Sequence, residues 1–358
     1  MSRRAGVAAL FAAAAVIGTV GVVAMSSGSQ PADAARVSAG AFLGRYVTPD
    51  GRVVRWDQGG DTVSEGQSYA LLLAQVAGDG ATFGRVWRWT RAKIAPRVGL
   101  LAYRASASGV TDPMPATDAD LVTAWALLRT SGPGSGRYHA DGRRIAAAVL
   151  AEETAKAKAT MLTAGPWATG NPATVNPSYL AFPAIEALGR RWRGVRAGSL
   201  ALVRSVTGGG RLLPPDWVRV DGTAARPTPA PDGKVPDVRY GLDAQRTVVW
   251  MAASCDRRVR RMAAGWWRVL SRPGRSTAIA LDQRGNVRVA TPHPLPLVAT
   301  AAAADAAGRP ADRDNLLAQA DAQNAAHPTY YGAAWAALGR ALLTTRSLGG
   351  CAGDGGGS

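Results

Sequence analysis

The stretch 243–254, DAQRTVVWMAAS, has a polar start and then carries the apolar residues Val248, Val249, Met251 and Ala252. A helix on the surface of a protein keeps one polar face toward water, and this stretch is too apolar for that arrangement. It therefore predicts an inner helix that other helices cover. A chain with such a helix belongs to a fold class with at least two layers of secondary structure.

Helical periodicity recurs along the rest of the chain. In 117–130, Leu121, Trp125 and Leu128 fall on one helix face. The expected helices cover 36–46, 64–78, 81–94, 117–130, 138–157, 178–192, 196–206, 243–254, 258–270, 296–307, 311–322 and 331–344. With short connections, this series predicts an all-α fold, an (α/α)₆ toroid of six helical hairpins. A two-domain helical bundle is the alternative.

Two stretches interrupt the helical pattern. Residues 208–240 are rich in Gly and Pro, which predicts a long irregular loop. Residues 278–290 alternate as two short strand-like runs around a turn at 283–286, which predicts a small β-hairpin. The expected toroid therefore carries one hairpin and long irregular loops.

The two ends of the chain differ in composition from its middle. Two arginines precede a long uncharged stretch, and the small residues Ala32 and Ala34 offer a cleavage site. Residues 1–34 therefore predict a signal peptide or, because the apolar stretch is long enough to cross a bilayer, an N-terminal membrane anchor. Either form predicts a secreted or extracytoplasmic protein. Residues 35–348 are the expected folded domain, and residues 349–358 are an expected flexible Gly-rich tail.

The chain is strongly basic, with 42 Lys and Arg residues against 25 Asp and Glu residues and a formal net charge of +17. Long-range repulsion argues against a polycationic substrate such as chitosan, whereas a neutral or an acidic polymer is compatible with this charge. The charge also suggests electrostatic association with an anionic cell envelope. We expect a monomer and no nucleic-acid partner.

Histidine and cysteine are too scarce to carry the chemistry. The three His and two Cys residues have no zinc spacing, which excludes a thiolate or imidazole metal site but not a carboxylate one. The sequence contains no phosphate-binding glycine loop, and we expect no cofactor. Cys255 and Cys351 are a candidate disulfide in an exported protein, and two unpaired residues are the alternative.

Acidic residues open three of the expected helices. They are Glu65 in 64–69 (SEGQSY), Asp118 and Asp120 in 116–121 (ATDADL), and Asp243 in 240–246 (YGLDAQR). Each carboxylate alone is explained by helix capping and the helix dipole. In a toroid, however, the inner helices start around one mouth, so these carboxylates would converge on one cleft. Gly66 would leave room there for a substrate, and Arg246 could pair with Asp243 one helical turn away.

Convergent carboxylates with aromatic neighbours are typical of glycosidic bond cleavage. One carboxylic acid protonates the leaving oxygen, while a second carboxylate activates water or attacks the sugar. Aromatic side chains stack on the apolar faces of sugars, and the chain has 11 Trp against 4 Phe. The Trp residues near loops or helix ends are Trp56, Trp87, Trp89, Trp167 and Trp217. Core packing is the alternative role for about half of them.

These motifs resemble family 8 of the glycoside hydrolases, particularly the bacterial endo-β-1,4-glucanases that accompany cellulose synthesis. The resemblance runs in order along nearly the whole chain after residue 34. It includes 42–46, 50–54 (DGRVV), 62–69, 78–79, 83, 87–90 (WRWT), 116–121, 175–179 (VNPSY), 214–218 (PPDWV) and 240–246. The family implies an (α/α)₆ toroid and hydrolysis with inversion of configuration.

The resemblance also implies roles for individual residues. Glu65 corresponds to the proton donor, Asp243 to the base that activates water, and Tyr179 to a residue that holds this water. Asp118 corresponds to the signature aspartate, which we interpret as a binder of the distorted central sugar and a tuner of Glu65. The expected substrate contacts are Asp120, Tyr103, Arg246, Trp217, Gln67 and Tyr69. Tyr103 stands where a Trp stacking platform is common in the family.

The proposed acid raises a physical question. A glutamate in the first helical turn has its anion stabilised, which lowers its pKa, whereas a general acid needs a raised pKa. Burial and the charge of Asp118 would have to override the dipole at Glu65.

The leading hypothesis is therefore inverting endo-hydrolysis of β-1,4-glucan, with xylan and mixed-linkage glucan also open. A polysaccharide lyase acting on an acidic glycan and a non-catalytic glycan-binding protein of the cell surface are the alternatives.

Overall fold

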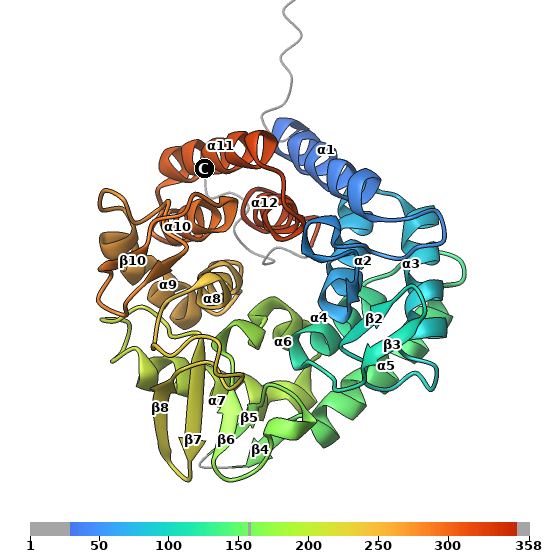
Figure 1. Ribbon diagram of the computed structural model, residues 1–358, viewed down its shortest axis with the longest axis horizontal. Helices are drawn as coiled ribbons and strands as arrows, with labels where there is room; N and C mark the ends of the chain where they lie inside the picture. The colour runs from blue at the N-terminus through green and yellow to red at the C-terminus, as the bar shows by residue number, and fades with distance from the viewer. Residues whose placement is uncertain (1–28, 157–158, 349–358) are drawn as a thin grey trace, which may run out of the picture.

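The computed structural model describes residues 29–156 and 159–348, which form a ring of helices in two layers (Figure 1). The inner layer contains α2 (Ser64–Ala77), α4 (Thr117–Leu128), α6 (Phe182–Ala187), α8 (Leu242–Ala252), α10 (Pro294–Ala306) and α12 (Tyr330–Thr344). The outer layer contains α1 (Ser29–Tyr46), α3 (Gly80–Lys93), α5 (Ser135–Glu152), α7 (Arg193–Val206), α9 (Arg257–Leu270) and α11 (Pro310–Ala326). Because outer and inner helices alternate along the chain, they pair as hairpins. The predicted (α/α)₆ fold is confirmed.

The composition of the helices explains which layer each one joins. Residues 244–252 of α8 are all buried, as the apolar stretch predicted. In α9, by contrast, Val259, Met262 and Trp266 are buried on one face, while arginines occupy the other. A helix with a polar face covers the ring from outside, and a helix without one is covered on all sides.

The ring closes between its first and last hairpins, because α12 packs against both α1 and α2. Its centre is filled by aromatic side chains from different inner helices. Trp250 lies edge-on to Trp125 and Trp335, with ring centroids 6.3 and 5.3 Å apart, and Trp335 is 5.5 Å from Tyr69. Such edge-to-face pairs stabilise the packing beyond the area that they bury. A closed ring around one core rules out the two-domain bundle.

The predicted helix boundaries agree with the structure within four residues, with three exceptions: α1 begins at Ser29 rather than at residue 36, α5 ends at Glu152 rather than at residue 157, and 178–192 is not one helix. That stretch divides into a 3₁₀ turn at Pro177–Tyr179, the short helix α6 and a second 3₁₀ turn at Arg190–Trp192. Pro183 stands in the first turn of α6, and a proline there cannot continue a helix from the preceding residues. The single long helix predicted for this stretch is therefore wrong.

Short antiparallel strands connect the hairpins. They are β1 (Thr62–Val63), β2 (Arg104–Ser106), β3 (Gly109–Asp112), β4 (Thr154–Lys156), β5 (Thr160–Leu162), β6 (Ala173–Val175), β7 (Trp217–Asp221), β8 (Ala224–Thr228), β9 (Ala280–Leu281) and β10 (Val287–Val289). The predicted hairpin at 278–290 is confirmed by the pairing of β9 with β10. The irregular loop predicted for 208–240 is partly wrong, because β7 and β8 form there and join β6 in a three-stranded sheet. Pro227 is compatible with β8 because β8 is an edge strand.

Several predictions concern the ends of the chain. Most of the expected signal or anchor segment lies in residues 1–28 and the Gly-rich tail is 349–358, both outside the described residues. Ala32 and Ala34 lie in the first turns of α1. Cys351 is also outside the described residues, so its pairing with Cys255 stays a prediction. Within the described part of the chain, no helix has the length and apolar character to span a bilayer.

Candidate active site

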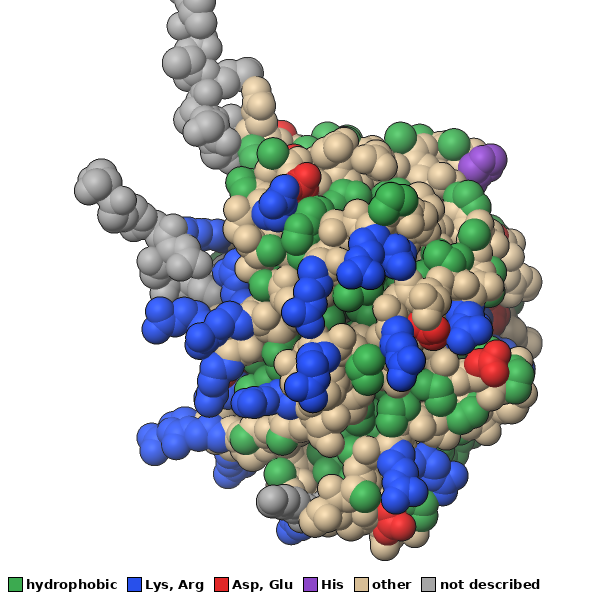
Figure 2. All heavy atoms as spheres, turned by 90° about the vertical axis from the view of Figure 1, so that its left-hand side faces the viewer, with side chains coloured by type: hydrophobic (Ala, Val, Ile, Leu, Met, Phe, Trp, Pro, Cys, Tyr) green, Lys and Arg blue, Asp and Glu red, His purple; other side chains and the backbone are tan. Residues whose placement is uncertain are grey.

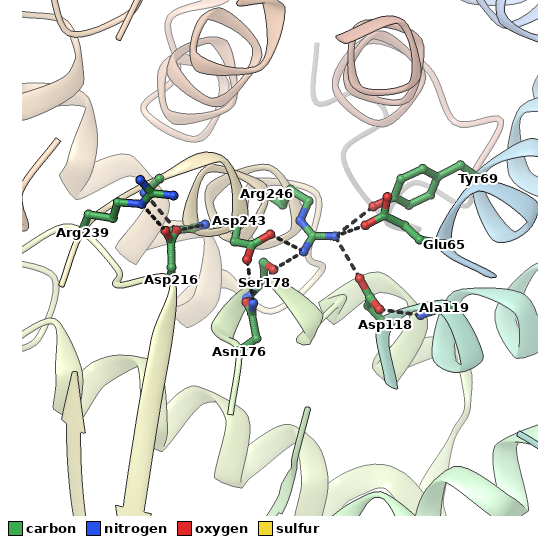
Figure 3. Close-up of polar contacts among 12 residues, drawn as sticks. Glu65, Tyr69, Asp118, Ala119, Asn176, Ser178, Asp216, Arg239, Asp243 and Arg246 are labelled. Carbon is green, nitrogen blue, oxygen red and sulfur yellow. Dashed lines mark hydrogen bonds and ion pairs between the residues drawn. The ribbon is translucent and has the colours of Figure 1, made fainter. Parts of the chain in front are cut away.

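The expected carboxylates meet at one mouth of the ring. Consecutive helices of the hairpins run in opposite directions, so the inner helices all begin at the same end. Glu65, Asp118 and Asp243 each occupy the first turn of an inner helix, on α2, α4 and α8. Figure 3 shows the three side chains turned toward one another across the mouth.

Arg246 lies between the three carboxylates and donates hydrogen bonds to all of them. Its Nη1 is 3.0 Å from Glu65 Oε2 and 2.9 Å from Asp118 Oδ2, and its Nη2 is 3.0 Å from Asp243 Oδ1 (Figure 3). The same two nitrogens also donate to the hydroxyls of Tyr69 and Ser178. Arg246 is only 2% exposed. This guanidinium therefore fixes the relative positions of the three carboxylates.

These bonds also limit how far apart Glu65 and Asp243 can be. Because each carboxylate has an oxygen 3.0 Å from a nitrogen of the same guanidinium, their nearer oxygens are at most about 8 Å apart. An inverting mechanism requires a separation of roughly 6.5–9.5 Å, which leaves room for water. The limit is compatible with that range and excludes carboxylates on opposite sides of the molecule.

The three carboxylates differ in how much they meet solvent. The side chain of Asp243 is 36% exposed, that of Glu65 is 18% exposed and that of Asp118 is 9% exposed. Asp243 Oδ2 accepts a further hydrogen bond from Asn176, at 3.0 Å. Asp243 is thus the carboxylate that water reaches most easily.

Burial determines the protonation of Glu65. Its pKa is raised to about 7: desolvation by burial raises it most, Arg246 opposes the rise, and the charges of Asp118 and Asp243 add to it. Burial also raises the pKa of Asp118, against the effect of Arg246. The raised pKa that a general acid needs is therefore found at Glu65, despite its position at a helix start.

A cleft passes over these residues in two connected parts. One cavity, of about 440 Å³, is lined by residues that include Glu65, Asp243 and Tyr330. The other, of about 630 Å³, includes Trp167 and Trp217 in its lining. Asp243 and Tyr103 line both cavities, so the two parts meet at the proposed base.

The walls of the second cavity carry aromatic surface for a sugar. Trp167 is 47% exposed, and Trp217 stands edge-on to Tyr179 with ring centroids 6.2 Å apart. The ring of Tyr179 in turn lies 5.5 Å from the guanidinium carbon of Arg246. Tyr179, Tyr103 and Trp217 therefore lie in the cleft, where the sequence placed them. Among the other tryptophans, Trp87 and Trp89 are buried in the core, which is the alternative role.

Two expected substrate contacts have structural roles instead. Gln67 is fully buried, and its amide group bonds to the backbone N–H of Val53 and the hydroxyl of Thr90. Asp120 is also fully buried and accepts a hydrogen bond from the backbone N–H of Leu101. Both side chains are turned into the core, so neither can touch a sugar in this structure. Tyr69 is 2% exposed and reaches the site only through its hydroxyl, which Arg246 contacts.

Gly66 also has a different role from the one predicted. A Cβ atom at Gly66 would lie 2.6 Å from the hydroxyl of Tyr330. The missing side chain therefore makes room for Tyr330 rather than for substrate. The Tyr330 hydroxyl lies 3.5 Å from Glu65 Oε1, the oxygen of Glu65 that Arg246 does not bind.

Asp216 is a site residue that was not predicted from the sequence. Its Oδ1 accepts hydrogen bonds from the backbone N–H groups of Gly241 and Ala244, and so anchors the start of the helix that carries Asp243. Its Oδ2 accepts a bond from Arg239. Burial and the charge of Asp243 raise the pKa of Asp216 to about 6. The only sequence feature that pointed to Asp216 is its position in the PPDW motif, directly before a strand. No local pattern predicts its hydrogen bond with residue 244.

The donor set does not favour a metal. Among residues 29–156 and 159–348, no group of three or more His, Cys, Asp or Glu side chains is arranged to hold one. Arg246 occupies the space between the carboxylates, where a cation would bind.

A closed ring of helical hairpins that brings a carboxyl of raised pKa and a more exposed carboxylate into one cleft provides the pair of carboxyl groups that glycoside hydrolases use. Residues 14–344 match the sequence pattern of the glycosyl hydrolases family 8, and the chain belongs to this family.

Relatives and solved structures agree with this assignment. An endoglucanase of Cellulomonas uda is 31% identical over 51% of this chain and 55% of its own length. A probable endoglucanase of Novacetimonas hansenii is 34% identical over 50% of this chain and 56% of its own length. These matches span about half the length of each relative. The structure of an endo-β-1,4-glucanase from Acetobacter xylinum has a TM-score of 0.67, with 27% identity over 86% of this chain and 97% of that one.

Proposed function

We propose that this protein hydrolyses internal bonds of β-1,4-glucan with inversion of configuration, with Glu65 as the general acid and Asp243 as the general base. The observation that carries the proposal is the arrangement around Arg246, which holds a carboxyl of raised pKa and a more exposed carboxylate in one cleft. The relatives named endoglucanase support the same reaction.

In the proposed reaction, Glu65 donates its proton to the glycosidic oxygen as the bond to the anomeric carbon breaks. Oε1 is the oxygen that delivers this proton, because Oε2 is bonded to Arg246. Asp243 accepts a proton from a water that attacks the opposite face of the sugar. Asn176 and Arg246 orient the Asp243 carboxylate, and Tyr179 lies beside it to help hold the water.

Asp118 has two proposed roles in this reaction. Its Oδ1 accepts from the backbone N–H of Ala119, and its Oδ2 accepts from Arg246, so its carboxylate is fixed beside Glu65. There it binds the distorted central sugar, and its charge helps to keep the proton on Glu65.

The shape of the cleft supports cleavage within a chain. Cavities extend on both sides of Asp243 and join there, so a polymer can bind with sugars on either side of the scissile bond. Trp167 and Trp217 on one side and the partly exposed Tyr331 on the other provide stacking surfaces.

The test compares the purified protein with the Glu65→Gln and Asp243→Asn variants on carboxymethylcellulose, mixed-linkage glucan, xylan and chitosan. We expect the wild type to be most active on a β-1,4-glucan and each variant to lose at least about a thousandfold. Proton NMR of the first products should show the α-anomer. Products that absorb ultraviolet light would instead indicate a lyase, and equal activity in Glu65→Gln would refute the assignment of the acid.

A further inference from the structure

A second groove lies on the outer wall of the ring, between α7 and α9. Two cavities of about 600 and 490 Å³ share Arg204, Gly209 and Arg258 in their linings, so they form one continuous depression. None of their lining residues belongs to the catalytic cleft. We call this depression the α7–α9 groove. Figure 2 shows Lys and Arg side chains gathered over the side of the ring that carries α9, with few acidic side chains among them.

Helical spacing places arginines of both helices along the groove. On α7, Arg193, Arg196 and Arg204 follow one another at intervals of three and eight residues. On α9, Arg258, Arg261 and Arg268 recur at intervals of three and seven residues. These intervals keep side chains on one face of a helix. Each helix therefore presents a stripe of arginine to the groove, and Arg211 of the connecting loop adds another.

Most of this positive charge is not neutralised. Asp256 is the only acidic residue in the lining, and both of its oxygens accept hydrogen bonds from Arg258, at 3.1 and 2.7 Å. The arginines that remain are Arg193, Arg196, Arg204, Arg211, Arg261 and Arg268. Across the part of the chain that the structure describes, none of these six forms an ion pair within 4.0 Å of an acidic side chain. Mutual repulsion of this kind is relieved when an anion binds.

The floor of the groove determines what kind of anion fits. Between the arginines it is lined by small residues, among them Ala197, Ala201, Gly210 and Gly265, so an extended chain can approach the backbone. The lining contains no aromatic residue. Single-stranded nucleic acids are usually bound by stacking on aromatic side chains, and membrane surfaces by inserted apolar ones. The larger apolar side chains of the lining, Leu200 and Met262, are each only 8% exposed, so the groove has neither an aromatic platform nor an apolar side chain that could insert into a membrane.

Its length suits a polymer rather than a single ion. Arg258 and Arg268 are ten residues apart on α9, which corresponds to about 15 Å along a helix. Arginine also binds carboxylate and phosphate groups through two parallel hydrogen bonds, a geometry that lysine lacks. Arginines at both ends of the groove can therefore hold successive acidic groups of one chain.

We propose that the α7–α9 groove binds a linear anionic polysaccharide through the carboxylate or phosphate groups that it bears. This site is separate from the catalytic cleft, and the bound polymer is a tether rather than the substrate. It would keep the enzyme near a matrix or envelope that contains acidic glycan. The proposal does not depend on which glucan the cleft hydrolyses.

The test measures binding of the full chain to fluorescent polygalacturonate and to inorganic polyphosphate, by anisotropy at about 0.1 M salt. The groove variant is Arg204→Gln/Arg211→Gln/Arg268→Gln. The control variant is Arg88→Gln/Arg97→Gln/Arg143→Gln, which removes the same charge from exposed sites on α3, on α5 and in the loop that follows α3. We expect the groove variant to bind polygalacturonate about tenfold more weakly, and the control less than about threefold more weakly. Both should keep wild-type activity on glucan.

Each outcome decides the proposal. The proposal is supported if only the groove variant loses polymer binding and if its remaining binding depends less on salt. The two probes then show whether the groove prefers carboxylate or phosphate groups. Equal losses in both variants would mean that the net charge alone attracts polyanions, which would overturn it. Tighter binding of a DNA duplex or of anionic lipid vesicles than of either polymer, or no binding at all, would also overturn it. Thermal unfolding of both variants checks that the ring remains folded.

Discussion

Replacing Asp118 by Asn should shift the loss of activity at alkaline pH to a lower pH. Glu65 must be protonated to act as the acid, and its pKa is about 7 because of burial and nearby negative charge. Asp118 and Glu65 accept hydrogen bonds from the same nitrogen of Arg246, at 2.9 and 3.0 Å, so their oxygens lie within about 6 Å of each other. The Asp118→Asn substitution keeps the shape of the side chain but removes its charge.

The size of the shift follows from this geometry. Two unit charges about 5 Å apart interact by about 3 kcal/mol at an effective dielectric constant of about 20. Arg246 lies between the two carboxylates and offsets a large part of this repulsion. We therefore expect the pKa of Glu65 to fall by about 1 unit in Asp118→Asn, which is about 1.4 kcal/mol. The sign is fixed, since removing a negative neighbour always favours the anion.

The assay is the dependence of kcat/KM on pH for a soluble glucan, measured from about pH 4 to about pH 10. Asp216→Asn is the matched control, because Asp216 is not among the charges that raise the pKa of Glu65. In that control the alkaline limb should stay in place. If Asp118→Asn lowers kcat and leaves the alkaline limb unmoved, Asp118 acts on the sugar alone and our electrostatic argument is wrong.

Three further predictions concern the structure around the site. Gly66→Ala should lower activity about tenfold, because its Cβ would displace the Tyr330 hydroxyl, and adding Tyr330→Phe should restore part of the loss in a double-mutant cycle. Burial raises the pKa of Glu153 to about 8, so this residue stabilises the fold fully below about pH 4.5 and loses that contribution as the pH rises to about 8. Thermal unfolding of wild type and Glu153→Gln should be compared at about pH 4.5 and about pH 8. The stability of Glu153→Gln relative to wild type should be higher at about pH 8. Asp216→Ala should cost about 1–2 kcal/mol in urea unfolding and lower kcat, because α8 loses its anchor at Ala244.

The sequence was sufficient to predict the ring and the carboxylates of the candidate site because both depend on local patterns. Apolar periodicity marks a helix without knowledge of its neighbours. An acidic residue in the first turn of an inner helix lies near the mouth, either in the cleft, as Glu65 does, or in the core, as Asp120 does. Glu65, Asp118 and Asp243 could all be found in this way. The fully apolar middle of α8 was enough to identify an inner helix.

The parts that escaped prediction depend on contacts between distant residues. Strand β6 pairs Val175 with Val218, and neither short segment has enough alternation to be identified alone. Asp120 shares the ATDADL motif with Asp118, yet the next residues on the helix turn it into the core. Motif membership therefore indicates the neighbourhood of a residue, whereas burial decides whether that residue can touch a substrate.

The proposed division of roles between acid and base follows from the presence of one cation, Arg246, among three carboxylates. If all three were ionised, Arg246 could neutralise only one charge in a site that is largely shielded from water. Asp118 has two donors at 2.9 Å to stabilise its anion, and Asp243 is exposed enough for water to solvate its charge. Glu65 has one such donor and a distant hydroxyl, so a proton costs least to retain there. The proposed proton donor is thus the carboxyl group that its surroundings leave least able to ionise before the substrate binds.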